Sequence, residues 1–380
     1  MDAREYLEQV LPTTEQVDRF VCRDVKEDID ENNKGWTYDA ELGWVLKDSC
    51  RDDGIDGART FYSYEATGAR TSLCSRGQTS RIHTYGNSMA HCDQVSDGET
   101  WQEYLGSHIG EPIENYGVGG YSVYQAYRRM RVVEETHPAE YIILNIFNDD
   151  HFRNLDALRG RLRHGGVSPC SWPLPHLRVD PDAGTCEERE NLCPTVESLY
   201  ELTDLDRFTE TFEDDPILAI TLALKNAVVE STDQNVPLLA GFRAPDSPLA
   251  RELAERHTRA ALFSTQKVVE MFESYVESTG RKLMIVLSHG RHIVKRRLLG
   301  EPDWDASFMD WLRDRPYPVI DFRDTHQEDY THWEADPDAY LDRHSIGHYA
   351  PAGNFFCAQA MKDELVAMLD PKPRAYPAGA

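Results

Sequence analysis

Short apolar runs that alternate with helix-like segments restrict the fold of this chain more than any other feature. The runs are rich in β-branched and aromatic residues, and the segments between them, such as 122–135 and 249–278, carry apolar residues at helical spacing. Strands that alternate with helices along a chain predict a parallel sheet that is covered on both faces. We therefore expect a three-layer α/β/α domain with a five-stranded parallel sheet. The predicted strands are Arg81–Tyr85, Pro112–Tyr116, Glu140–Phe147, Lys282–Ser288 and Pro318–Phe322.

Two regions fall outside this alternation. Residues 1–78 are expected to form an N-terminal extension, a helix followed by irregular β-hairpins, because GWTYDAELGWVLKDSC and ARTFYSYEATGART combine Gly, Asp and aromatic residues. Residues 79–370 would form the main domain, which ends in a helix that begins near Pro351. An insert at about 155–215 is rich in Pro, Gly and Cys, and such a long, poorly periodic insert often serves as a lid or pocket wall. A surface excursion without a role is the alternative.

The charge of the chain excludes two classes of partner. Asp and Glu number 66 against 40 Lys and Arg, which gives a net charge of −26. Such a surface repels nucleic acid and anionic membranes. The sequence also has no run of 18 apolar residues that could span a bilayer and no signal-peptide pattern at its start. Its eight cysteines form no C-x-x-C pair and are expected to be reduced thiols, which favours a cytoplasmic location.

Polar residues and glycines follow each predicted strand. In an open α/β sheet, ligands bind beyond the carboxyl ends of the strands. Ser88 follows the first strand on a glycine-containing turn, Gly120 lies in a glycine turn after the second, and Asn148 follows the third. His348 lies beyond the fifth. A serine, a histidine, backbone N–H groups and an amide are the components of acyl transfer: nucleophile, base and oxyanion donors.

Four further residues near these strand ends are candidates for binding substrate. The arginines and the histidine among them could receive an anionic substrate, or they could pair with some of the surplus carboxylates. The four candidates are Asn87, Arg153, His289 and Arg291.

Four segments resemble, in order, the signature blocks of the SGNH (GDSL-like) hydrolases. RIHTYGNSMAHCDQVSDGETWQEYLG is similar to the first block, NYGVGGYSVYQ to the second, ILNIFNDDHF to the third and GHYAPAGNFFCAQAM to the last. The resemblance covers residues 81–152 and 280–368. It implies the flavodoxin-like SGNH hydrolase fold and a serine esterase that uses no cofactor or metal.

The resemblance also implies a role for each matching residue. Ser88 would attack the carbonyl carbon of a small-molecule acyl ester, and His348 would accept the serine proton. The oxyanion would be held by the backbone N–H groups of Ser88 and Gly120 and by the Asn148 side chain. Water would release the acyl group in a hydrolase, and another alcohol or amine would do so in an acyltransferase.

Three positions depart from the family pattern. Asn87 replaces the Asp of the first block, which is not the nucleophile, and Ile146 replaces a Gly in the third. Ser345 occupies the position, three residues before the histidine, where the family usually has the acid of its triad. We expect the nearest acid, Asp342, to orient His348 instead. The alternatives are a Ser–His dyad or a more distant acid, for which the candidates are Asp321 and Asp324.

Two other functions compete with this interpretation. The first is a metal site, although no recognised zinc spacing is present. The second is a binding module that has this fold and no catalytic activity, since fold alone does not establish activity. The candidate metal ligands are His289 with His292; Asp149, Asp150 and His151; and Cys170, His176, Cys186 and Cys193.

Overall fold

The computed structural model of the chain describes residues 1–21, 35–164, 172–229, 236–238, 242–244, 248–333 and 335–376. The chain divides into two compact units. Unit 1 consists of Met1–Val45 and His151–Lys267, and unit 2 consists of Leu46–Asp150 and Val268–Ala380. The predicted N-terminal extension therefore contributes to both units, and the predicted insert lies in unit 1.

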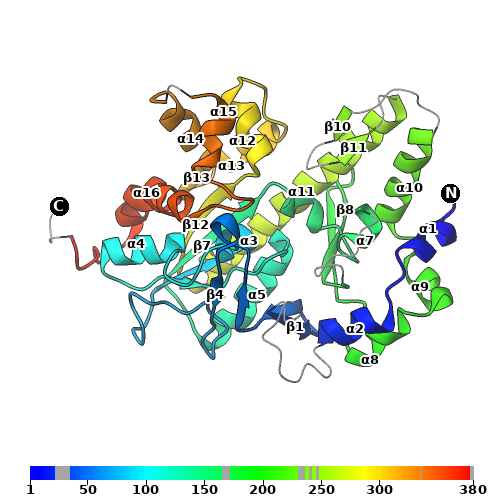
Figure 1. Ribbon diagram of the computed structural model, residues 1–380, viewed down its shortest axis with the longest axis horizontal. Coiled ribbons are helices and arrows are strands. Elements are labelled where there is room, and N and C mark those ends of the chain that lie inside the picture. The colour runs from blue at the N-terminus through cyan, green and yellow to red at the C-terminus, as the bar shows by residue number, and fades with distance from the viewer. Residues whose placement is uncertain are drawn as a thin grey trace. The chain divides into compact units, whose positions relative to one another are not determined.

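Unit 2 contains a five-stranded sheet in the order β13-β12-β7-β5-β6. Figure 1 labels three of these strands, β13, β12 and β7. Every neighbouring pair of strands is parallel. The predicted α/β fold with a five-stranded parallel sheet is thus confirmed, although only two residues of the second predicted strand pair in the sheet. The strands are β5 (Ile82–Tyr85), β6 (Glu114–Asn115), β7 (Tyr141–Phe147), β12 (Lys282–Ser288) and β13 (Val319–Asp321).

Successive side chains of β5 point to opposite faces of the sheet, and each face meets a helix. Thr84 accepts a hydrogen bond from Gln102 of α4 (Trp101–Ile109), at 3.1 Å. His83 lies on the other face and contacts Glu134 of α5 (Val123–Thr136), at 2.7 Å. The predicted last helix is α16 (Pro351–Met368), which lies beside α4 in Figure 1.

The hydrophobic core on the α4 and α16 face of the sheet is continuous. Strand residues such as Ile143 and Val286 pack there with Trp101 of α4 and with Met361 and Leu365 of α16, and all five are almost completely buried. Burial of side chains of this size stabilises a fold by about 1.5–3 kcal/mol each. This core supports the strand ends on which the candidate catalytic residues lie.

The other elements of unit 2 flank the sheet. β3 and β4 pair in antiparallel fashion, but only β4 lies in ARTFYSYEATGART, where the sequence predicts a hairpin, and β3 precedes that segment. These elements are β3 (Ser49–Arg51), η1 (Ile55–Gly57), β4 (Thr60–Tyr62), α3 (Ser88–His91), α12 (Arg291–Leu298), α13 (Ala306–Arg313), α14 (Phe322–Tyr330), α15 (Pro337–Asp342) and the last part of α11 (Pro248–Thr279).

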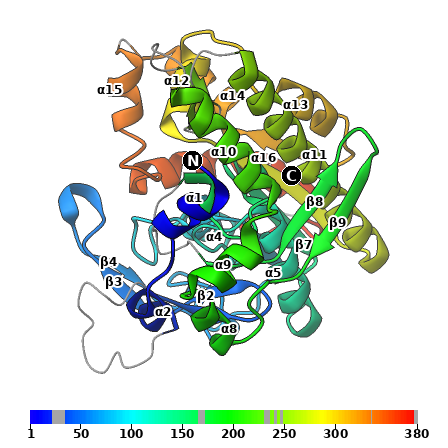
Figure 2. The same ribbon diagram turned by 90° about the vertical axis from the view of Figure 1, so that its right-hand side faces the viewer.

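Unit 1 combines helices with short hairpins. Among the described residues of this unit, the longest hairpin is β8 with β9, which lies inside the predicted insert and is visible in Figure 2. Phe20 stacks on Trp172 with ring centroids 4.5 Å apart, which ties an N-terminal helix to the insert within this unit. Its elements are α1 (Ala3–Gln9), α2 (Thr14–Val21), β1 (Trp36–Asp39), β2 (Gly43–Leu46), α6 (Asp150–Arg153), α7 (Arg161–His164), β8 (His176–Asp180), β9 (Thr185–Arg189), α8 (Val196–Glu201), α9 (Leu205–Phe212), α10 (Pro216–Val229), β10 (Val236–Leu238), β11 (Phe242–Ala244) and the first part of α11.

None of the helices in the described parts of the chain is both long enough and apolar enough to cross a membrane.

Candidate active site

The turn between β5 and α3 presents Ser88. Gly86 has a φ of 151°, and a Cβ at this position would lie 2.6 Å from the Asn145 carbonyl oxygen, so the turn requires glycine. Asn87 caps α3, because its Oδ1 accepts a hydrogen bond from the Met89 N–H at 2.6 Å. Ser88 is therefore the first residue of a capped helix at the carboxyl end of a central strand.

Ser88 and His348 meet directly. The distance between Ser88 Oγ and His348 Nε2 is 2.8 Å, although 260 residues separate them in the sequence. His348 lies just before α16, which begins at Pro351. The structure therefore brings together the two residues that the sequence predicts as nucleophile and base.

Gln94 contacts the other ring nitrogen of His348. Its Oε1 lies 3.0 Å from Nδ1, and the same oxygen accepts a hydrogen bond from the His348 backbone N–H at 2.7 Å. Sequence reasoning missed Gln94, because it considered only acids for this position. A glutamine inside the first signature block carries no signal of its own, since its role depends on a residue more than 250 positions away.

The expectation that Asp342 orients His348 is corrected by the structure. Its carboxylate pairs with Arg291, and its side chain is 69% exposed. The Ser345 side chain also contacts another group, since its Oγ accepts a hydrogen bond from the Gly347 N–H at 3.3 Å. Asp342 lies at the end of α15, which packs near α12, and this explains its pairing with an arginine of α12.

The two more distant acids are also engaged elsewhere. Asp321 contacts His289 at 2.9 Å and Arg323 at 2.7 Å, and it is buried. Burial opposes its ionisation, but interactions with His289 and Arg323 hold the pKa of Asp321 well below its usual range. Asp324 pairs with Arg297 at 2.5 Å.

Asn148 has one side of its amide fixed by the backbone. Its Oδ1 accepts a hydrogen bond from the Gly290 N–H at 2.7 Å, and the residue is 3% exposed. With the oxygen held in this way, Nδ2 is the group that can donate to a ligand.

A polar contact joins the loop of Asn148 to the turn of Ser88. Asn87 Nδ2 donates to Asp150 Oδ2, which also accepts a hydrogen bond from the Phe147 N–H at 2.9 Å. Asn87 Nδ2 also lies 3.3 Å from Asn145 Oδ1. Because these partners flank Asn148 in the sequence, the nucleophile turn and the loop that carries Asn148 are held side by side.

The glycine turn that follows β6 lies against α3. A Cβ on Gly117 would be 2.3 Å from the His91 backbone nitrogen, so only glycine fits there. Gly120 has a φ of 88° and precedes Ser122, which caps α5. The predicted backbone donor thus belongs to a turn that packs directly on the helix of Ser88.

The helix that begins at Ser88 ends at a histidine that contacts an aspartate. His91 Nδ1 contacts Asp93, and His91 Nε2 lies 2.7 Å from the Tyr64 hydroxyl. Burial lowers the pKa of His91 to about 4, so at neutral pH its Nδ1–H donates to Asp93 and its Nε2 accepts from Tyr64. The Asp93 carboxylate also lies against Gly119, where a Cβ would be 3.0 Å from Oδ2.

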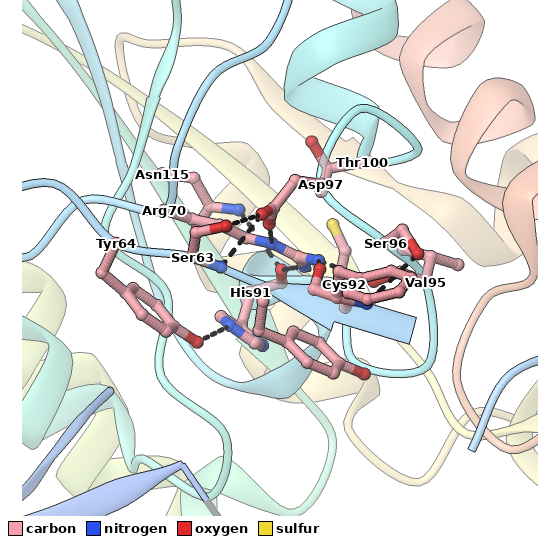
Figure 3. Close-up of polar contacts among 12 residues, drawn as sticks. Ser63, Tyr64, Arg70, His91, Cys92, Val95, Ser96, Asp97, Thr100 and Asn115 are labelled. Carbon is pink, nitrogen blue, oxygen red and sulfur yellow. Dashed lines mark hydrogen bonds and ion pairs between the residues drawn. The ribbon is translucent and has the colours of Figure 1, made fainter. Parts of the chain in front are cut away.

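A buried arginine organises the loop that follows α3, as Figure 3 shows. Arg70 pairs with Asp97 at 2.7 Å, and both side chains are almost completely buried. Its remaining N–H groups donate to three backbone carbonyls at the end of α3 and in this loop: His91 at 2.7 Å, Cys92 at 2.9 Å and Val95 at 2.6 Å.

The conformation of this loop explains why it needs such support. Cys92 and Gln94 both have positive φ values, 64° and 71°, which cost energy for residues other than glycine. Asn115 adds a further donor to the His91 carbonyl, at 3.3 Å. Arg70 was missed from the sequence because it lies in the predicted N-terminal extension, far from any signature block.

The remaining predicted substrate-binding residues have different surroundings. Arg291 pairs with Asp338 and Asp342, which is the alternative that the sequence left open. His289 contacts Asp321 and is 4% exposed. Arg153 is buried and belongs to unit 1, whereas Ser88 and His348 belong to unit 2.

Within the described ranges, no group of three or more His, Cys, Asp or Glu side chains is arranged to hold a metal ion. This includes the histidines after β12 and the acidic loop after β7, which the sequence left as metal candidates. Cys170, a member of the third candidate set, lies outside the described residues.

Comparison with known proteins gives a structural likeness without a sequence match. Neither a protein-family model nor a curated protein matches this sequence. Among solved structures, the chain is similar to the “Structure of a putative lipolytic protein of G-D-S-L family from Desulfitobacterium hafniense DCB-2”. The likeness covers 73% of this chain and 98% of that chain, with 11% sequence identity and a TM-score of 0.30.

Proposed function

We propose that this protein is a serine esterase, a carboxylic-ester hydrolase that works through an acyl-enzyme on Ser88. The observation that carries the proposal is the 2.8 Å contact between Ser88 Oγ and His348 Nε2 at the carboxyl end of the sheet. A nucleophile and base within hydrogen-bond distance, with the base held by a third group, is the arrangement that nucleophilic catalysis requires.

In the first step, His348 Nε2 accepts the Ser88 hydroxyl proton while Oγ attacks the ester carbonyl carbon. The Ser88 N–H supports the resulting oxyanion, because the first N–H groups of a helix have no partner within the helix. The Gly120 N–H and Asn148 Nδ2 are the further donors. The tetrahedral intermediate then collapses, and His348 returns its proton to the departing alcohol.

In the second step, water hydrolyses the acyl-enzyme. His348 Nε2 accepts a proton from the water as its oxygen attacks the acyl carbon, and Ser88 Oγ leaves with that proton. The products are the carboxylic acid and the free serine. This sequence needs no metal and no cofactor.

The test is covalent labelling with a fluorophosphonate, followed by turnover of a panel of p-nitrophenyl esters. Wild type should be labelled on Ser88, and Ser88→Ala should lose both labelling and turnover while it keeps its melting temperature. Ser274→Ala is the matched control, because Ser274 is an exposed serine of α11 in the same unit. Labelling that persists in Ser88→Ala would place the nucleophile elsewhere.

Product analysis separates the esterase from its alternatives. An enzyme that is labelled on Ser88 but turns over esters only after an alcohol or amine is added would be an acyltransferase. A wild-type protein that is never labelled would support a binding module. Loss of turnover on chelation, with recovery on adding zinc, would favour metal-dependent chemistry.

A further inference from the structure

The contacts of Gln94 define which of its amide atoms faces His348. The His348 backbone N–H can only donate, and its hydrogen bond of 2.7 Å therefore requires the Gln94 oxygen on that side. Gln94 Nε2 faces the Asp53 carbonyl oxygen at 3.1 Å, which can only accept. Two independent backbone contacts thus give the same orientation of the amide.

The surroundings hold Gln94 in this orientation. The Gln94 N–H donates to the Tyr62 hydroxyl oxygen at 2.8 Å, and that hydroxyl lies 3.2 Å from both carboxylate oxygens of Asp53. Gly347 has a φ of 128°, and a Cβ there would lie 2.6 Å from Gln94 Oε1. The amide can therefore approach His348 only because residue 347 is glycine.

We propose that Gln94 is the positioning residue that fixes the tautomer of His348, in the place where an aspartate is usual. An amide oxygen can only accept a hydrogen bond, so the 3.0 Å contact requires the proton of the neutral imidazole to be on Nδ1. Nε2 then presents its lone pair to the Ser88 hydroxyl. The inference rests on the proposed function, since it concerns the base of that reaction.

A neutral amide differs from a carboxylate in one respect that can be measured. Both accept the Nδ1–H, but only the carboxylate adds negative charge beside the imidazolium that forms during the reaction. A carboxylate within hydrogen-bond distance raises the pKa of a neighbouring cationic acid by about 1–3 units. Asp93 already acts on His348, because its electrostatic interaction with this histidine contributes to the lowered pKa of Asp93. A carboxylate at position 94 would add to that charge, so the wild-type base should stay neutral, and active, at a lower pH than the base of a variant with an acid at position 94.

The experiment compares Gln94→Met with Gln94→Glu by their pH profiles of kcat/KM and their fluorophosphonate labelling rates. Gln94→Met keeps the length of the side chain but removes the acceptor, and we expect both rates to fall by roughly 10²-fold or more. Gln94→Glu should retain turnover at alkaline pH, and the acidic limb of its profile should move to higher pH by about one unit or more. Melting temperatures report any loss of folded protein.

The outcomes that would overturn the inference differ from those that concern the proposed function. Unchanged kcat/KM and labelling rates in Gln94→Met would show that Gln94 does not position His348. An acidic limb of the Gln94→Glu pH profile at the same pH as in wild type would show the same. Absence of labelling in wild type would instead contradict the proposed function. In that case ¹⁵N NMR of the His348 imidazole, assigned with His348→Gln, still decides the inference: a proton on Nδ1 supports it, and a proton on Nε2 overturns it.

Discussion

Asn87 shows how one amide sets the charge around the nucleophile turn. Its Nδ2 donates to the buried Asp150 carboxylate, and its Oδ1 caps α3. An aspartate could still cap the helix, but it would set a second carboxylate against Asp150. The asparagine, which departs from the family pattern in sequence, is thus explained by a neighbour 63 residues away.

We predict that Asn87→Asp lowers the free energy of unfolding by about 1–3 kcal/mol at pH 7.5, because a buried hydrogen bond is replaced by like charges. Repulsion raises the folded-state pKa of the new carboxyl above its unfolded value. The penalty is therefore full above the raised pKa and shrinks as the pH falls through it. Urea unfolding at pH 7.5 and pH 5 measures both effects.

The double variant Asn87→Asp with Asp150→Asn is the control for this prediction, because it exchanges donor and acceptor. It should recover the part of the loss that like charges cause, whereas the Phe147 N–H, which bonds the same Asp150 oxygen, loses its acceptor. Equal losses in the single and double variants would show that the charge of residue 87 is not what matters.

Asn148 carries a second prediction at this scale. Removal of one side-chain oxyanion donor typically costs 10²–10³ in kcat, and we expect Asn148→Ala to fall in that range on p-nitrophenyl acetate. The variant also loses its contact with Gly290, so its melting temperature is measured alongside. A kcat within about fivefold of wild type would exclude Asn148 from the oxyanion site.

Among the elements, α3 and its following loop depend on a residue outside them. We predict that Arg70→Met lowers the free energy of unfolding by about 3–5 kcal/mol, because it leaves the Asp97 carboxylate buried without its partner. Arg59→Met is the matched control. Arg59 pairs with Asp52 on the surface of the neighbouring hairpin, with both side chains more than 60% exposed. Loss of such an exposed pair should change the free energy of unfolding little. Chemical denaturation of both variants measures the difference, and equal losses would contradict the prediction.

The sequence predicted elements better than it predicted contacts between them. The strands could be found because β7 and β12 are buried on both faces, which leaves an apolar run in the sequence. Ser88 and His348 could be found because they follow strand ends in recognisable motifs. Gln94 could not, because its function comes from a backbone bend and from a histidine that only the folded chain brings near.

Asp342 is a residue for which sequence proximity predicted a contact that the folded chain does not make. Proximity to His348 in the sequence suggested a role, but α15 directs this residue to Arg291. The orientation of a short helix depends on its tertiary packing, and sequence distance does not report it.

For the molecule as a whole, buried histidines make the free energy of unfolding depend on pH below about 6.5. Burial lowers the pKa of His326 to about 3 and of His91 to about 4, and burial also lowers the pKa of His344. Their unfolded-state pKa is about 6.5, so below that pH the unfolded chain binds more protons than the folded chain.

We therefore predict that the free energy of unfolding falls as the pH is lowered from 6.5 to 5, by up to about 1.4 kcal/mol per pH unit for each such histidine. His83 does not reverse this trend: its contacts with Glu114 and Glu134 outweigh burial and raise its pKa, so its stabilising contribution is already complete below pH 6.5. Urea titrations at several pH values measure the slope. His326→Gln should reduce it, and an unchanged slope would count against a neutral His326 in the folded state.

The division of the chain into units has a consequence for its biosynthesis. Each unit is built from two separate stretches, and the second stretch of unit 2 follows the second stretch of unit 1 in the sequence. Ser88 leaves the ribosome 260 residues ahead of His348, which at 5–20 residues per second is a delay of roughly 10–50 s. During that interval the strands around Ser88 lack β12, β13 and α16, the partners that bury their apolar side chains. The nascent chain should therefore be a client of chaperones that bind apolar segments until β12, β13 and α16 have emerged.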